Sequence, residues 1–266
     1  MIINNWFVAR LPIIIGCWIF SFPFLLLTIE IILRHVEPIL PYVSDLGVIL
    51  PSAVLFTCFM CSIALLMSYF VILRFHLNKR LLHKTISKRN RTQLITGIMI
   101  VISMSAIGSF RNAENYFIQI VHNVMASILF LMLAIDILLA IEINQSISDQ
   151  ESIIIVQKIL LFLCLLFSFT VVVGAFISFR NDPWIFFHQH RRLHWSSKQI
   201  GYYGHLLSTV SEWVLILMSA PYLFTYGKHF KRFLFEQNQS IIPERIDAEI
   251  DCAIRVPSKT LLNVSS

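Results

Sequence analysis

Three polar side chains near the C-terminal end of the sequence carry groups that can do chemistry. In the stretch GYYGHLLSTVSEWVLILMS, His205, Ser208 and Glu212 are spaced so that a helix would place them on one face. An imidazole, a hydroxyl and a carboxylate aligned in this way can pass a proton, hold an ion or bind a polar head group. The same residues can instead form hydrogen bonds that tie this helix to a neighbour. The spacing alone leaves both interpretations open.

Asp45, Glu114 and His122 are candidate partners for His205 and Glu212, although they come from other segments. We expect all five to gather towards the same side of the fold and to form one polar pocket. The set lacks the fixed ligand spacing of a metal site and has no evident serine nucleophile. We therefore predict no metal and no cofactor, and the pattern favours a protein that is not an enzyme.

A histidine-rich stretch, HQHRRLH, precedes this segment and contains His188, His190 and His194. Three histidines at that spacing could bind zinc or copper, or respond to acidic pH. The neighbouring Arg191 and Arg192 disfavour a bound cation. An ordinary loop at the membrane surface is the interpretation that the sequence favours.

The elements that must position these residues are membrane helices. Hydrophobic residues make up 57% of the 266 residues and charged residues only 14%, a balance typical of membrane proteins. Six apolar segments are near or above the length that crosses a bilayer, and the chain inside lipid must be helical. We predict an all-α integral membrane protein with one domain over residues 1–235 and a polar, disordered tail over 236–266. Its six transmembrane helices are predicted over residues 11–33, 52–73, 94–110, 118–141, 153–179 and 204–226.

Basic residues indicate the orientation of these spans. The segment from Arg74 to Arg91 carries seven lysines and arginines and no acidic residue, which predicts that it faces the cytosol. With six spans, both termini are then cytosolic. We expect this basic segment, predicted to be a loop, to contact anionic membrane lipids, and we expect no nucleic-acid partner for a chain without a soluble domain.

The connection between the first two predicted spans is stiff and polar. It reads HVEPILPYVSDLG, in which Pro38 and Pro41 restrict the backbone and should end the first helix. We expect Gly47 to provide a bend with positive φ. Asp45 could cap the second span or meet the polar residues of the last span from above.

This loop resembles the signature loop of the DRAM (damage-regulated autophagy modulator) family, within the wider Frag/DRAM/Sfk superfamily. The resemblance covers roughly residues 11–235. It rests on the loop residues His35, Pro38, Pro41, Tyr42, Ser44, Asp45 and Gly47, and on the last-span residues Tyr202, His205, Ser208, Glu212 and Trp213. Asn112, Glu114 and His122 match the family more loosely, and Leu46 and Asn123 replace a threonine and an aspartate of its pattern.

The resemblance implies a protein of lysosomes or other endomembranes that promotes autophagy without being an enzyme, with autophagy or lysosomal membrane proteins as partners. The plasma membrane is an alternative location. Sister branches of the superfamily imply a second hypothesis, action on lipid in the remodelling of GPI anchors in the Golgi or endoplasmic reticulum. A third is a small proton-coupled transporter or channel with Glu212 in its pathway.

Overall fold

The computed structural model describes residues 5–81, 87–111, 115–147, 151–181 and 193–231. Six long helices fill these ranges, and each is long and apolar enough to cross a membrane, which confirms the six predicted spans. They are α1 (Asn5–Ile32), α2 (Ser52–Leu81), α3 (Ser87–Ser109), α4 (Tyr116–Ile147), α5 (Glu151–Asn181) and α7 (Tyr202–Phe224). Glu114, His188, His190 and the predicted tail over 236–266 lie outside the described residues.

The basic segment between the second and third spans is mostly helix, so the prediction of a basic loop there was wrong. α2 continues to Leu81 and α3 begins at Ser87, and both Arg74 and Arg91 are helical. Lysine and arginine are good helix formers, so charge at the end of an apolar run does not end a helix. Arg74 is also only 2% exposed, which removes it from any surface that contacts lipid.

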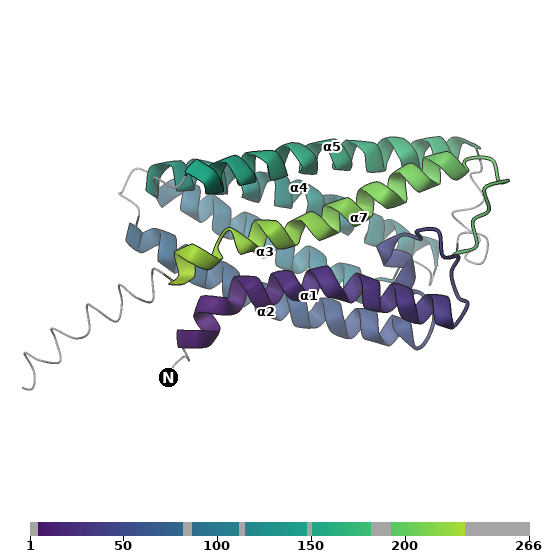
Figure 1. The fold of residues 1–266 in the computed structure, drawn as a ribbon, viewed down its shortest axis with the longest axis horizontal. Helices are drawn as coiled ribbons and strands as arrows, with labels where there is room; N and C mark the ends of the chain where they lie inside the picture. The colour runs from purple at the N-terminus through teal and green to yellow at the C-terminus, as the bar shows by residue number, and fades with distance from the viewer. Residues whose placement is uncertain (1–4, 82–86, 112–114, 148–150, 182–192, 232–266) are drawn as a thin grey trace, which may run out of the picture.

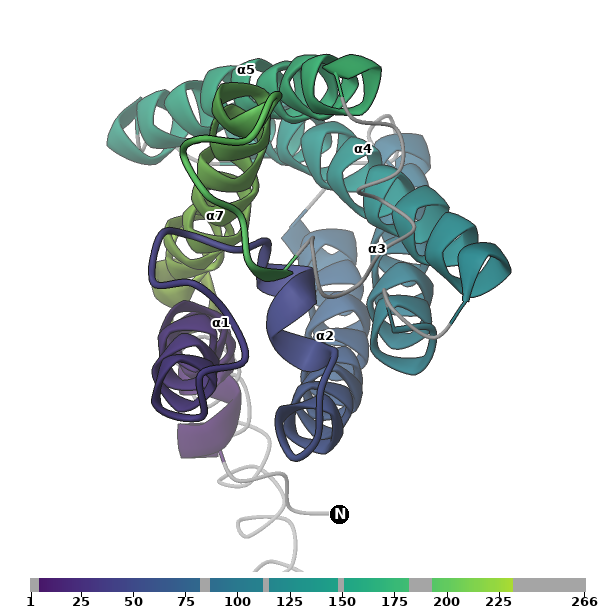
Figure 2. The same cartoon turned by 90° about the vertical axis from the view of Figure 1, so that its right-hand side faces the viewer.

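The helices form a closed ring in chain order, as the end-on view in Figure 2 shows. Each long helix packs against the next one along the chain, and α7 closes the ring by packing against α1. The start of α1 and the end of α7 lie at the same end of the bundle (Figure 1). We call this the terminal end, and its assignment to the cytosol stays a prediction.

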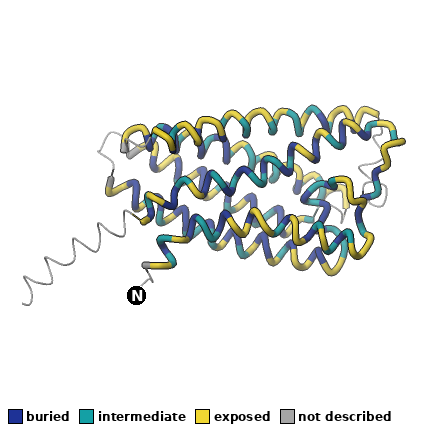
Figure 3. Tube along the Cα trace, in the orientation of Figure 1, coloured by how far each residue is buried: buried dark blue, intermediate teal, exposed yellow. Residues whose placement is uncertain are grey.

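Buried and exposed positions alternate along the helices (Figure 3), and many of the exposed side chains are large and apolar. On α5, Phe162, Phe169 and Phe176 recur every two turns and are 61–67% exposed, as expected of a surface that faces lipid tails. α5 and α7 approach closely where two glycines meet. A Cβ on Gly174 would lie 2.7 Å from the backbone oxygen of Gly204.

The connection between α1 and α2 folds back over the opposite end of the ring as a short 3-10 helix, η1 (Val43–Gly47), and we call this the η1 end. η1 packs against α1, α2 and α7. The prediction of positive φ at Gly47 was wrong, since Gly201 is the glycine with positive φ among the described residues. Glycine is needed at Gly47 for space, because a Cβ there would overlap the ring of Phe56.

Candidate functional site

The loop that carries η1 is fastened to the last helix by two hydrogen bonds. The indole Nε1 of Trp213 donates to the backbone oxygen of Pro41 at 2.9 Å. Two residues further along the loop, the backbone N–H of Val43 donates to Oε2 of Glu212 at 2.7 Å. The two segments are about 170 residues apart in sequence, and neighbouring side chains of α7 bind both points of the loop.

His205 takes part in the same contact through its ring. It stacks on Trp195 with the ring centres 4.3 Å apart, and Tyr42 meets it edge-on at 5.2 Å. The ring is buried, with 4% exposed. His205 therefore packs the loop against α7 and lies away from the cavities described below.

Glu212 lies where this loop meets the interior of the ring. Its carboxylate is also within hydrogen-bonding range of the Ser44 side chain, and Asp45 is close enough to interact with it electrostatically. The last span thus binds the loop at two consecutive residues, Val43 and Ser44. Two cavities meet at Glu212, which lines both of them.

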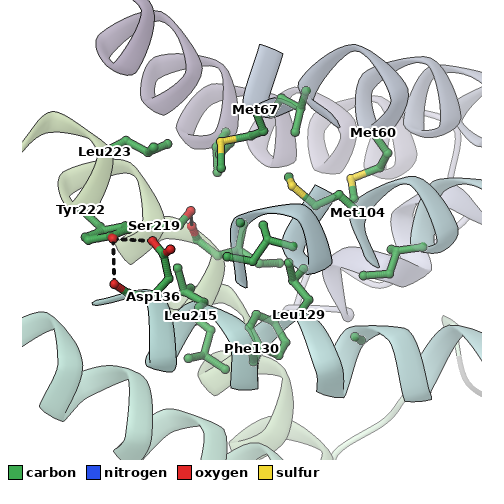
Figure 4. Close-up of a pocket in the computed structure, with 18 of the residues that line it drawn as sticks. Met60, Met67, Met104, Leu129, Phe130, Asp136, Leu215, Ser219, Tyr222 and Leu223 are labelled. Atoms are coloured by element: carbon green, nitrogen blue, oxygen red, sulfur yellow. Dashed lines mark hydrogen bonds between the residues drawn. The ribbon is translucent and has the colours of Figure 1, made fainter. Parts of the chain in front are cut away.

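The larger of these cavities is a cleft of about 280 Å³ at the η1 end, between α4, α5 and α7. Asn123, Ser127 and Val172 line it and are exposed, so the cleft opens to the surface of the bundle. The smaller cavity, of about 130 Å³, runs inside the ring from Ser44 to Arg74. Its wall is mainly apolar and includes Met60, Met67 and Met104 (Figure 4).

His122 lines both cavities and is held by α3. Its Nδ1 lies 2.6 Å from the backbone oxygen of Phe110, just after the end of that helix. A carbonyl oxygen only accepts, so Nδ1 carries the proton, and Nε2 is an acceptor whenever the ring is neutral. The side chain is 2% exposed. This hydrogen bond fixes the orientation of an imidazole at the edge of the cleft.

The structure brings some of the five residues that were predicted to form one pocket together and places the others elsewhere. Glu212 and His122 line the same two cavities, from α7 and α4. Asp45 is fully buried in η1 beside Glu212, and His205 packs against Trp195 and Tyr42. Glu114 lies outside the described residues. Tyr42 and Ser44, which were predicted only as loop residues, line the cleft.

The beginning of the loop is held by contacts with acidic side chains. His35 lies 3.4 Å from the carboxylate of Glu30, which is fully buried at the end of α1. Glu37 lies 3.3 Å from Nδ1 of His194, the described histidine of the HQHRRLH stretch. Among the described residues, no group of histidine, cysteine and acidic side chains could hold a metal ion.

A second buried polar cluster lies at the other end of the inner cavity, and sequence reasoning missed it. Arg74 donates from Nη1 and Nη2 to the two carboxylate oxygens of Asp136, both at 2.7 Å. Tyr222 donates to the same carboxylate at 2.5 Å and Thr96 at 3.1 Å. Arg74 and Asp136 are 2% and 1% exposed. The cluster joins α2, α3, α4 and α7 at the terminal end of the cavity.

The signal that could have found this pair is the presence of opposite charges at similar depth. Asp136 is an acidic residue within the fourth predicted span, and Arg74 follows directly after the predicted end of the second. An acidic residue inside the membrane needs a partner of opposite charge. Arg74 can be that partner, but it was predicted to lie in a loop. Nearby, Asn144 donates to Gln157 at 2.9 Å and Gln157 to Thr225 at 3.0 Å, a further buried link between helices at this end.

Comparison with known proteins gives the family. Residues 7–233 match the Frag1/DRAM/Sfk1/Cwh43P N-terminal domain. The chain belongs to this family. The Frag1/DRAM/Sfk1/Cwh43P match covers all six long helices and η1, and therefore both polar clusters.

Relatives within the Frag1/DRAM/Sfk1/Cwh43P family include DNA damage-regulated autophagy modulator protein 2 of three mammals. The mouse protein is 24% identical over 97% of this chain and 98% of its own length. The rat protein is 25% identical over 85% of this chain and 86% of its own, and the bovine protein is 23% identical over 76% of each. No solved structure matches the chain.

Proposed function

We propose that this protein modulates autophagy from the lysosomal membrane or another endomembrane, without being an enzyme. The observation that carries the proposal is the extent of the similarity to the mouse autophagy modulator, which covers 97% of this chain and 98% of the relative. An alignment of that extent includes every helix, both cavities and the loop on α7. On this proposal the η1 end acts by binding, to a lipid or to another autophagy or lysosomal membrane protein.

The polar residues at the η1 end support binding rather than only packing. Glu212 and His122 come from different helices, and each is held by a backbone group, Val43 N–H and the Phe110 carbonyl. Both line a cleft that is open to the surface. Side chains fixed in this way present a preformed polar surface, which lowers the entropy cost of binding.

The basic side chains at the terminal end support contact with anionic lipids. Lys79 and Arg80 at the end of α2, and Lys88, Arg89 and Arg91 at the start of α3, are exposed. Arg89 also pairs with Glu142 at 3.0 Å. If this end faces the cytosol, these residues lie where anionic lipids are concentrated.

The test is location together with autophagic flux. Full-length protein carrying a C-terminal tag is compared with markers of lysosome, Golgi, endoplasmic reticulum and plasma membrane. Flux is measured in a null line as the turnover of a lipidated autophagy marker with lysosomal proteolysis blocked or active. We expect lysosomal residence, lower flux in the null line and restoration by the wild-type gene. Golgi or endoplasmic-reticulum residence with unchanged flux would overturn the proposal.

A second candidate is action on a membrane lipid, such as a role in remodelling the lipid of GPI anchors. The observation in its favour is that Glu212 and His122 meet at a cleft open to the membrane-facing surface. This candidate predicts Golgi or endoplasmic-reticulum residence. It also predicts altered lipid chains on GPI-anchored proteins in the null line, and the loss of that activity in Glu212→Gln with normal protein level.

A further inference from the structure

The cleft at the η1 end has a polar wall on a helix that crosses the membrane. Gln119, Asn123 and Ser127 are four residues apart on one face of α4, and all three line the cleft. Asn123 and Ser127 are exposed. The Ser127 hydroxyl donates to the backbone oxygen of Asn123 at 2.9 Å. The side-chain amides of Gln119 and Asn123 lose hydrogen bonds to water where they face lipid tails, so they need a polar partner. The cleft can supply one by holding a polar head group.

Behind the polar cleft lies space suited to a hydrocarbon chain. The inner cavity shares Ser44, His122, Ala126, Phe130 and Glu212 with the cleft, so the two adjoin. Its volume of about 130 Å³ is close to that of an engineered apolar cavity of about 150 Å³ that binds benzene. That is room for part of one chain, not for two acyl tails. Methionines line the cavity, and their flexible side chains can adapt to a chain of variable path (Figure 4).

The charges around the cleft restrict the head group. Glu212, His122 and Tyr42 are the titratable side chains among the residues that line it, and the described lining contains no lysine or arginine. At the far end of the inner cavity, Nη1 and Nη2 of Arg74 both donate to Asp136, and they also donate to the Tyr226 hydroxyl and the Gln93 carbonyl, so Arg74 is not open to an anion. A phosphate at this position would find no basic side chain among the described residues that line the cleft. Hydroxyl or amino groups would instead donate to the acceptor positions of Glu212 that Val43 and Ser44 leave open.

We propose that the cleft binds a single-chain amphiphile whose head carries hydroxyl or amino donors and no phosphate, the chemistry of a sphingoid base. The head lies between Glu212 and the polar stripe of α4, and the chain enters the methionine-lined cavity past Ala126. A ligand reaches the site laterally, because the cleft opens between α4 and α5. This inference goes beyond the proposed function and does not rest on it.

The test uses purified full-length protein in detergent and a photoreactive sphingosine as the probe. We expect saturable labelling that maps to α4 or α7. Unlabelled sphingosine should displace the probe, and its phosphorylated form should do so about tenfold less well or worse. Labelling that does not saturate, labelling confined to exposed side chains of α5 remote from the cleft, such as Ile155 and Ile159, or equal competition by the phosphorylated form would overturn the proposal.

Two variants test separately the binding of the head group and the binding of the hydrocarbon chain. Glu212→Gln keeps an oxygen that can accept from Val43 N–H but removes the charge, and it should weaken sphingosine binding about tenfold. Ala126→Phe fills the junction of the two cavities and should abolish labelling. The matched control is Val124→Phe, at a side chain of the same helix that is 48% exposed, which should bind as wild type.

Size-exclusion profile and thermal midpoint are recorded for every variant before binding is compared. If Ala126→Phe does not fold, Ala175→Leu on the opposite wall of the cleft replaces it and should weaken labelling at least severalfold. Folded variants that bind as wild type at both positions would contradict the proposal. Because binding is measured on the purified protein, its outcome is independent of whether the null line shows an autophagy defect.

Discussion

The two ends of the bundle bury polar side chains in different ways. At the terminal end, Asp136 accepts two hydrogen bonds from Arg74, one from Tyr222 and one from Thr96, which is about the full capacity of a carboxylate. At the η1 end, Glu212 lines two cavities, one of them open to the surface. A charged residue inside a membrane helix is therefore no guide to function by itself. What distinguishes the two carboxylates is that Asp136 is paired with a buried guanidinium, whereas Glu212 accepts from loop groups and lines a cleft that is open to the surface.

The largest loss of stability is expected when the ion pair at the terminal end is removed. Arg74→Met leaves the Asp136 carboxylate buried without its cation, which costs about 3–5 kcal/mol. We expect little folded protein in a size-exclusion profile. The double variant Arg74→Met/Asp136→Leu should recover much of the loss, because it removes both charges. A folded single variant with a wild-type thermal midpoint would show that the ion pair does not hold these helices together.

A smaller effect is expected where η1 packs on α2. Gly47→Ala places a methyl group in the ring of Phe56 and should destabilise the protein by about 1–3 kcal/mol, measured as a lower thermal midpoint. Gly227→Ala is the matched control, because its Cβ would lie at an ordinary 3.4 Å from Ile13. Equal midpoints for the two variants would contradict the close approach at Gly47.

The fastening of the loop can be loosened without unfolding the bundle. Trp213→Phe keeps an aromatic ring but loses the hydrogen bond to Pro41, worth about 0.5–1.5 kcal/mol. We expect faster hydrogen exchange over residues 36–47 and unchanged exchange at the terminal end. Trp18→Phe, at a side chain that is 46% exposed, serves as control. Exchange that rises equally at both ends would mean that the two regions are not independent.

The smallest effect is expected at the rim of the η1 end. Glu37 and His194 pair at 3.3 Å, but the Glu37 side chain is 51% exposed. Glu37→Gln should cost less than about 1 kcal/mol, and the difference should shrink at high salt. Thermal midpoints at low and high salt check this. A larger, salt-independent loss would assign the rim a structural role comparable to that of Trp213.

The sequence predicts the six helices well because the bilayer sets their length and the apolar runs are uninterrupted. It predicts several helix ends poorly: α1 begins six residues before the predicted span, α3 begins seven residues before it, and α4 ends six residues after it. The chain at Arg74 carries charge, yet α2 continues for seven more residues because the guanidinium finds Asp136 in the interior. Partners of this kind depend on which helices pack side by side. A local sequence pattern carries no information about that packing.

Sequence reasoning found the residues of the η1 end but not how they meet. Asp45 was expected to reach the last span, whereas the backbone N–H of Val43 is the group that binds Glu212. A hydrogen bond donated by the main chain cannot be predicted from the type of residue that donates it. His205 and Glu212 share a face of α7, yet one packs under the loop and the other lines the cavities, because η1 covers only part of that face.

The most direct test of the contrast between the two ends compares two glutamates in the autophagic-flux assay of the null line. Glu212→Gln removes the carboxyl group that lines the cavities, and Glu142→Gln removes a partly exposed carboxylate at the terminal end, where Arg89 is its partner. We predict that both variants fold, with thermal midpoints within about 4 °C of wild type. We further predict that Glu142→Gln restores flux and Glu212→Gln does not. Full restoration by folded Glu212→Gln would contradict a functional role for the η1 end.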